Sequence, residues 1–140
     1  MGKTLEERFW PKVDKSGDCW VWTASKHPGG YGQIAMKPRG MRGAHRVAWE
    51  MLRGPVPEGM QLDHLCRNRA CVNPAHMEVV DQRTNVLRGS GHTAVNARKT
   101  VCKRGHSLAD AYVHRGMREC RTCKLMKQKR YRKTGSAVLT

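Results

Sequence analysis

Alternation of apolar and polar positions predicts a short run of strands and helices in the middle of the chain. Apolar residues recur with helical spacing over residues 45–53, and the Gly-Pro pair that follows should end this helix. Residues 59–65 and 77–80 have the pattern of two short strands, and Asp81 is a suitable N-cap for a helix over residues 82–88. The local order is therefore strand, loop, strand, helix, which indicates a small α+β fold.

The N-terminal region predicts one helix and a hairpin. Residues 4–7 have the form of a capping box and should open a short helix that stops at Pro11. Residues 19–23 are aromatic and β-branched, and residues 33–35 form a second apolar run beyond a turn rich in glycine. We expect these two runs to pair as an N-terminal hairpin, followed by a basic loop over residues 37–43.

The C-terminal third has a different composition. Residues 90–100 are small and polar and are expected to be a linker between a first domain, residues 1–89, and a second module, residues 101–133. A basic helix is expected over residues 121–133 of that module, and residues 134–140 are expected to be a disordered tail.

The charge balance indicates a polyanionic partner. The chain has 140 residues with 27 Lys and Arg against 11 Asp and Glu, a formal net charge of +16. Nucleic acid is the usual partner, because phosphate contacts release condensed counterions, but a solubility surface or a structural protein of ribosomal type has the same composition. The sequence shows no apolar run long enough to span a membrane and no signal peptide, so we expect a cytoplasmic protein.

The six cysteines form two groups, each with one histidine at metal-ligand spacing. We expect each group to hold one structural Zn²⁺, with all four positions filled by the protein. Ordinary buried thiols are the alternative. The expected ligands are Cys66, Cys71 and His76 with Cys19 as the fourth, and Cys102, His106, Cys120 and Cys123.

Four further residues have the chemistry that phosphodiester hydrolysis needs. His64, at the end of a strand, is suited to deprotonate water near neutral pH, and a structural histidine or a further zinc ligand is its alternative role. Asp63 and Asn85 offer the oxygen ligands that Mg²⁺ or Mn²⁺ prefers. An orienting hydrogen bond is the alternative role for Asp63, and a solvent-facing position is the alternative for Asn85. Asn73 lies in the loop between the two strands.

Three stretches resemble one nuclease family. Residues 62–78, together with residues 83–89 and 45–50, resemble the HNH or ββα-metal endonucleases, above all the phage-borne enzymes and the His-Cys box homing endonucleases. The resemblance implies a zinc-stabilised ββα-metal core. It also implies that His64 is the general base, that Asn85 and, in one branch of the family, Asp63 bind the catalytic metal, and that Asn73 fixes the loop and orients the histidine. Asn85 stands where the family name has its last histidine.

The resemblance also implies the substrate and the setting. The protein would be a phage-encoded enzyme that cuts or nicks double-stranded DNA, leaving 5′-phosphate and 3′-hydroxyl ends, and a homodimer would suit a double-strand cut. Its C-terminal zinc-finger module would add affinity for DNA. The expected DNA-binding residues are Arg39, Arg42, Arg46, Arg83, Arg88, Lys127, Lys129, Arg130 and Arg132.

Two rival functions have the same charge and cysteine pattern. A non-catalytic zinc-finger DNA-binding protein would not need His64, whereas a ribosome-associated or RNA-binding protein would prefer folded RNA to duplex DNA. The combination of Asp63, His64 and Asn85 argues against the first rival, and a competition between duplex DNA and RNA would separate the second.

Overall fold

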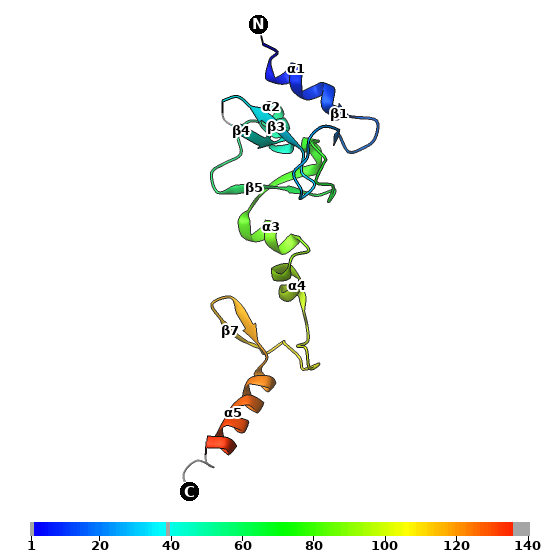
Figure 1. The fold of residues 1–140 in the computed structure, drawn as a ribbon. Helices are drawn as coiled ribbons and strands as arrows, with labels where there is room; N and C mark the ends of the chain where they lie inside the picture. The colour runs from blue at the N-terminus through cyan, green and yellow to red at the C-terminus, as the bar shows by residue number, and fades with distance from the viewer. Residues whose placement is uncertain (1, 39, 136–140) are drawn as a thin grey trace. The chain divides into compact units, whose positions relative to one another are not determined.

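The computed structural model describes residues 2–38 and 40–135. The chain divides into two compact units, Met1–Arg88 and Gly89–Thr140. Figure 1 shows the first unit as a mixture of short strands and helices and the second as a hairpin with helices. The small α+β character that the sequence predicts is therefore confirmed. None of the described helices combines the length and the apolar character that a membrane span requires.

Helix α1, Leu5–Phe9, opens the first unit with the expected capping box. The Thr4 hydroxyl accepts a hydrogen bond from the Glu7 N–H at 3.2 Å, and the Glu7 carboxylate accepts one from the Thr4 N–H at 2.7 Å. The helix ends at Phe9, and Pro11 lies in the 3-10 turn that follows, Trp10–Lys12, because proline lacks the N–H that an α-helix would require there.

The predicted N-terminal hairpin is wrong in its pairing. Strand β2, Val21–Trp22, pairs with β1, Val13–Asp14, whereas β3, Gln33–Met36, pairs with β4, Gly40–Gly43. Each strand takes the partner across its shorter connection. The segment between β2 and β3 closes on itself through a single bridge, Lys26 with Gly32. The expected basic loop over residues 37–43 is accordingly a turn followed by strand β4.

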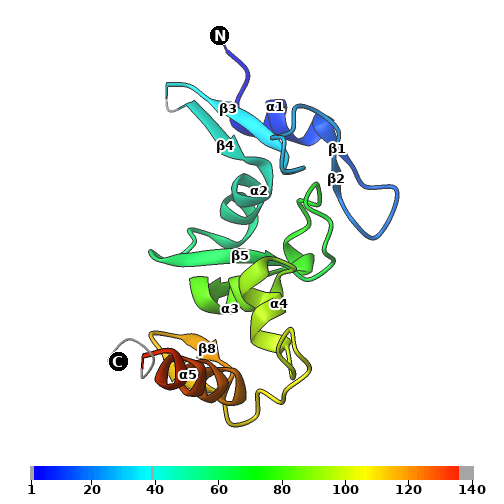
Figure 2. The same ribbon diagram turned by 60° about the horizontal axis from the view of Figure 1, so that its bottom comes forward.

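Helix α2, Ala44–Arg53, confirms the amphipathic pattern and supplies one wall of the core. Its buried side chains meet Phe9 and Trp22, the two largest buried residues, which contribute no exposed surface. Gly32 makes this packing possible, since a Cβ at this position would lie 2.6 Å from the Trp22 ring. Figure 2 shows α2 beside the β3–β4 hairpin.

Strands β5, Met60–His64, and β6, Met77–Asp81, form an antiparallel pair in which Asp63 lies opposite Glu78. A short 3-10 helix, Pro74–His76, leads into β6. Helix α3, Gln82–Arg88, follows β6 directly and contacts both strands. Asp81 caps this helix as predicted, accepting a hydrogen bond from the Thr84 N–H at 2.8 Å. The expected order of strand, loop, strand and helix is therefore present.

The second unit begins with a helix where the sequence predicted a linker. Helix α4, His92–Arg98, buries Ala94 completely. The Arg118 guanidinium donates hydrogen bonds to the carbonyls of Asn96, Ala97 and Lys99, which satisfies the open C-terminal end of α4. This long-range contact explains why a small, polar segment is ordered.

Strands β7, Tyr112–His114, and β8, Met117–Glu119, pair as a hairpin, and helix α5, Arg121–Gly135, follows. The basic helix is therefore present and extends beyond residue 133. Thr134 belongs to it, because its hydroxyl donates to the Arg130 carbonyl at 3.2 Å, so the expected tail does not begin there. Residues 136–140 of that expected tail lie outside the described residues.

Candidate functional site

The first unit brings four predicted metal ligands together. The ligand atoms of Cys19, Cys66, Cys71 and His76 all lie within 4.8 Å of one another. The Nδ1 atom of His76 is 3.5 Å from the Cys19 sulfur and 3.7 Å from the Cys71 sulfur. A tetrahedral zinc site, with Zn–S bonds of about 2.3 Å and Zn–N bonds of about 2.0 Å, has S···N edges of about 3.5 Å. The donor set and its spacing therefore fit a metal of the zinc type.

Backbone pairing between distant segments brings Cys19 to this cluster. The Trp22 N–H donates to the Ala70 carbonyl and the Val72 N–H donates to the Trp20 carbonyl, each at 2.8 Å. Residues 20–22 therefore run beside residues 70–72, so that the loop before β2 meets the loop after β5. From the sequence alone, Cys19 is identified as the fourth ligand only by elimination, because it is the one cysteine of the first hundred residues outside the loop.

Asn73 links these same two loops. Its side-chain oxygen accepts from the Ala75 N–H at 3.0 Å, and its amide nitrogen donates to the Asp18 carbonyl at 3.1 Å. Asp18 and Ala75 are the neighbours of Cys19 and His76 in the sequence, and neither contact involves His64. The Asn73 side chain therefore connects residues 18 and 75, and it has no direct hydrogen bond to His64.

The second unit gathers the other four predicted ligands. The ligand atoms of Cys102, His106, Cys120 and Cys123 also lie within 4.8 Å of one another. The Nδ1 atom of His106 is 3.3 Å from the Cys123 sulfur, and the Cys102 and Cys123 sulfurs are 3.8 Å apart. All six cysteines of the protein are free of disulfide bonds. Both clusters can therefore hold a zinc-type metal.

His64 is buried at the end of β5, with 6% of its surface exposed. Its Nε2 atom lies 3.0 Å from the carbonyl oxygen of Cys71. A carbonyl only accepts hydrogen bonds, so Nε2 carries the proton and donates it, and Nδ1 retains a lone pair. Burial lowers the pKa of His64 below its usual value, against the opposing effects of this hydrogen bond and of the Asp63 charge. The side chain is therefore a neutral base in a fixed orientation.

Two residues that are not among the predicted catalytic residues lie against His64. The rings of His45 and Tyr31 have centroids 5.0 Å and 5.9 Å from that of His64. Burial, followed by the charges of His64 and Arg46, lowers the pKa of His45 to about 4. His45 is therefore neutral as well, and it adds no charge that would compete for a proton. No spacing rule connects residues 31 and 45 with residue 64, because the contact depends on the packing of α2.

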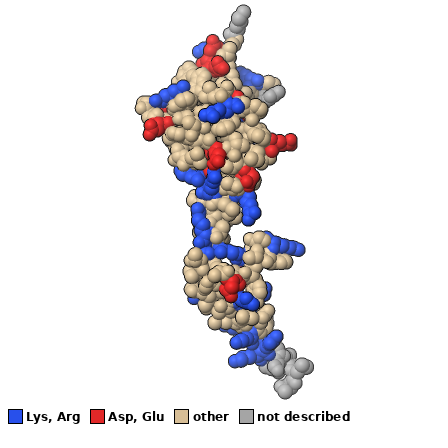
Figure 3. Space-filling view, turned by 180° about the vertical axis from the view of Figure 1, so that it is seen from behind, with Lys and Arg blue, Asp and Glu red and all other residues tan. Residues whose placement is uncertain are grey.

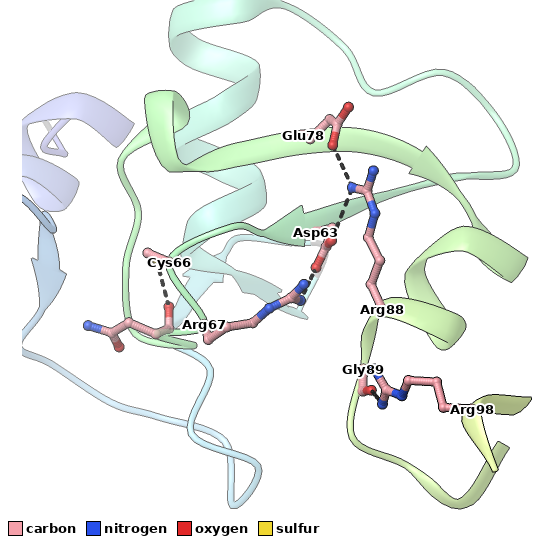
Figure 4. Close-up of polar contacts among 8 residues, drawn as sticks. Asp63, Cys66, Arg67, Glu78, Arg88, Gly89 and Arg98 are labelled. Atoms are coloured by element: carbon pink, nitrogen blue, oxygen red, sulfur yellow. Dashed lines mark hydrogen bonds and ion pairs between the residues drawn. The ribbon is translucent and has the colours of Figure 1, made fainter. Parts of the chain in front are cut away.

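Asp63 is also buried, but its neighbours are different. Its Oδ1 atom accepts from Arg67 at 2.8 Å, and its Oδ2 atom lies 3.4 Å from Arg88, which also reaches Glu78 at 2.5 Å. Figure 4 shows the two guanidinium groups on either side of the carboxylate. Arg67 was not among the expected residues. Its φ of 58° is a left-handed conformation that non-glycine residues seldom adopt, and such residues concentrate at functional sites.

Asn85 is half-buried on α3. It lies three residues before Arg88, so the two side chains share one face of the helix. Because Arg88 reaches Asp63, this is the face that meets the end of β5. Helical spacing therefore places Asn85 on the side of α3 from which Arg88 reaches Asp63. His64, the next residue along the strand, has a separate set of contacts.

The expected DNA-binding residues have different surroundings. Arg42 and Arg46 both lie near the Glu50 carboxylate, at 2.7 Å and 3.5 Å, so that part of their charge is neutralised. Arg83 is exposed at the start of α3. Arg39 lies outside the described residues. On α5, Lys127 and Arg130 line a groove, and Lys129 and Arg132 are exposed away from it.

Comparison with known proteins gives a family for the central segment. Residues 42–87 match the family described as HNH endonuclease. This segment runs from β4 to the last turn of α3, and it contains Asp63, His64, Asn73 and Asn85 but not Cys19 or the second unit. The chain therefore contains a segment that matches the HNH endonuclease family, and the resemblance inferred from the sequence is confirmed.

Three curated phage proteins are similar to the chain. The "Uncharacterized gene 5.3 protein" of Enterobacteria phage T3 is 39% identical over 44 residues, covering 31% of this chain and 44% of the relative. "Protein 2.8" of Escherichia phage T7 is 33% identical over 86 residues, 58% of each chain. "Protein 7.7" of the same phage is 32% identical over 68 residues, 49% of this chain and 52% of the relative. The chain spans about half the length of these relatives, and no solved structure matches it.

Proposed function

We propose that the protein is a metal-dependent DNA endonuclease that hydrolyses phosphodiester bonds with His64 as the general base. The observation that carries this proposal is the hydrogen bond from His64 Nε2 to the Cys71 carbonyl. It fixes the tautomer and leaves Nδ1 free to accept a proton from water. The HNH match over residues 42–87 supports the same reaction class.

Burial supports this role of His64. A general base must be unprotonated when the substrate arrives, and burial lowers the pKa of His64. The neighbouring His45 ring excludes water from one side of the base without adding a positive charge. Water can therefore lose its proton to a neutral imidazole whose ring cannot turn without breaking the bond to Cys71.

Asp63 and Asn85 are the residues that would hold the divalent ion. When bound, Mg²⁺ or Mn²⁺ would neutralise the charge that develops on the phosphate and on the leaving oxygen. A carboxylate and an amide oxygen suit such a hard ion. The carboxylate already faces Arg67 and Arg88, but its two oxygens have about four lone-pair sites, so an ion and an arginine can share it. Orientation of the site through these two arginines is the alternative role of Asp63.

The two Cys and His clusters would each hold one structural Zn²⁺. Four protein ligands fill a tetrahedral site, which leaves no open position for water or substrate. In the first unit the cluster includes Cys71, whose carbonyl orients His64, and the loop that Asn73 holds. Asn73 would therefore act on catalysis through the loop, by positioning Cys71.

Double-stranded DNA is the proposed substrate. The net charge of +16 favours a polyanion, and Arg83 is exposed at the start of α3, two residues before Asn85. Arg88 and Arg67 flank the buried carboxylate and remain partly exposed, which suits contact with a phosphate near the reacting bond. The products would carry 5′-phosphate and 3′-hydroxyl ends.

A time course on supercoiled plasmid tests this function. We expect wild type to convert the plasmid to open circles with Mg²⁺ and not without it, and we expect His64→Ala to lose this activity. His114→Ala is the matched control, since His114 is an exposed histidine on β7. Direct conversion to linear DNA would indicate two active sites acting together, as in a homodimer. Equal cleavage by His64→Ala would refute the role of His64.

A non-catalytic zinc-finger DNA-binding protein is the alternative, favoured by the second cluster and its basic helix α5. Under that alternative, wild type, His64→Ala and His114→Ala would all bind plasmid and none would cut it.

A competition between labelled duplex DNA and folded RNA tests the substrate class as well. Preference for the RNA would overturn the assignment of DNA as the substrate.

A further inference from the structure

A basic groove in the second unit takes no part in the cleavage step proposed above. The groove measures about 690 Å³ and lies between the loop that begins at Cys102 and helix α5. We call it the basic groove. The residues that matter here are Lys103, Arg104, Lys124, Lys127, Arg130 and Tyr131.

The charge of the basic groove is almost entirely positive. Five Lys and Arg residues line it, and Glu119 is the one acidic residue among the described lining residues. Glu119 pairs with Lys124 at 2.9 Å, which leaves Lys103, Arg104, Lys127 and Arg130 without an acidic neighbour in the groove. Figure 3 shows basic side chains crowded beside the C-terminal end of the described chain. A groove with this charge can bind the phosphate backbone of a nucleic acid.

Tyr131 gives the basic groove an exposed aromatic ring. It has 67% of its surface exposed, although it lies on a helix beside a groove. The unit's other tyrosine, Tyr112, has its ring covered by Arg121 and Lys124, with the cations 5.3 Å and 4.8 Å from its centroid. Tyr131 therefore has a free face, whereas Tyr112 serves the packing of the unit.

An exposed ring among phosphate-binding cations distinguishes between forms of nucleic acid. In a duplex the faces of the bases are stacked on one another, and only their edges are accessible in the grooves. A single strand offers base faces together with its phosphates, and proteins bind it with aromatic rings and a positively charged groove. The basic groove combines these two features.

We propose that the basic groove binds single-stranded DNA, with Lys127 and Arg130 contacting backbone phosphates and one base stacked on Tyr131. This site is separate from the residues that would cleave DNA. The protein would therefore hold DNA that has an unpaired strand, such as a replicating, gapped or branched molecule, through its second unit.

Fluorescence anisotropy of the full-length zinc-loaded protein tests this site without any cleavage. The probes are a labelled thymidine strand of about 15 nucleotides and a labelled hairpin duplex, in buffer without Mg²⁺. The double variant Lys127→Gln/Arg130→Gln should weaken binding of the strand and lower the salt slope of log K by about 1.4, since each phosphate contact contributes about 0.7. The matched control is Arg115→Gln/Lys133→Gln, which removes the same charge from exposed positions of the second unit outside the groove lining.

Tyrosine variants test the stacking itself. Tyr131→Ala should weaken binding of the strand about tenfold with an unchanged salt slope, and Tyr131→Phe should retain the affinity because it keeps the ring. Binding of the duplex should change less than twofold in both variants. Equal losses in the two double variants, or equal effects of Tyr131→Ala on strand and duplex, would overturn the proposal. These outcomes do not depend on whether the first unit cuts DNA.

Discussion

The two units hold the same set of ligands, three cysteines and one histidine, in very different surroundings. The first cluster adjoins a core that includes Phe9 and Trp22, both fully buried. In the second unit, only Ala94 and Cys120 are buried among the described residues. Small domains bury little surface and often need a metal to fold. The second cluster is thus the core of its unit, whereas the first is an addition to a core that already exists.

We expect the first cluster to have a different role, because its unit already has an apolar core. Its ligand Cys71 presents the carbonyl that orients His64, and its loop is tied down by Asn73. In the first unit we therefore expect the metal to align the catalytic site, and in the second unit we expect it to create the fold. On this account, two identical ligand sets have different roles.

The largest effect should follow from Cys123→Ser. Loss of one ligand removes metal binding whose apparent free energy is on the order of 10 kcal/mol, and the second unit has almost no apolar core to replace it. We expect amide NMR signals of residues 100–133 to collapse to random-coil positions while those of the first unit stay dispersed. The matched variant Cys71→Ser should leave α2 and its core folded and should reduce cleavage. Dispersed signals from the second unit in Cys123→Ser would contradict the comparison.

A smaller effect should follow from truncating the core of the first unit. Trp22→Ala removes a fully buried ring and should lower the free energy of unfolding by about 3–5 kcal/mol. All four tryptophans lie in the first unit, so the fluorescence of the remaining three reports its urea unfolding alone. Tyr112→Ala, in the second unit, is the control and should leave this transition unchanged. A loss below about 1 kcal/mol for Trp22→Ala would mean that the metal, and not the apolar core, holds the first unit.

The smallest effect should come from the N-terminal cap. Thr4→Ala removes the hydroxyl that accepts from the Glu7 N–H and should cost about 1 kcal/mol in the same urea experiment. Lys3→Ala, at the exposed neighbouring position, should have no measurable effect. If the two variants were equally stable, α1 would contribute nothing to the first unit beyond its apolar contacts.

Local patterns predicted α1, α2, α3, α5 and both ligand sets, because caps, periodicity and ligand spacing act over a few residues. They did not predict the pairing of β2 and β3, because each strand pairs across its shorter connection. They did not predict α4, because its C-terminal end is stabilised by hydrogen bonds from Arg118, some 20 residues away. The same limit applies to the site. Arg67 and His45 approach the predicted residues only through the folded loop and the packing of α2, and no sequence period connects them.

Chemical rescue of His64→Ala tests the central claim most directly. The single-turnover rate of plasmid nicking should fall by about 10²- to 10⁴-fold in this variant, since a positioned base contributes about that much. Added imidazole should restore part of the rate in His64→Ala and leave the wild-type rate unchanged. A variant that nicks as fast as wild type, or imidazole that accelerates both proteins by the same factor, would contradict the role of His64 as the base.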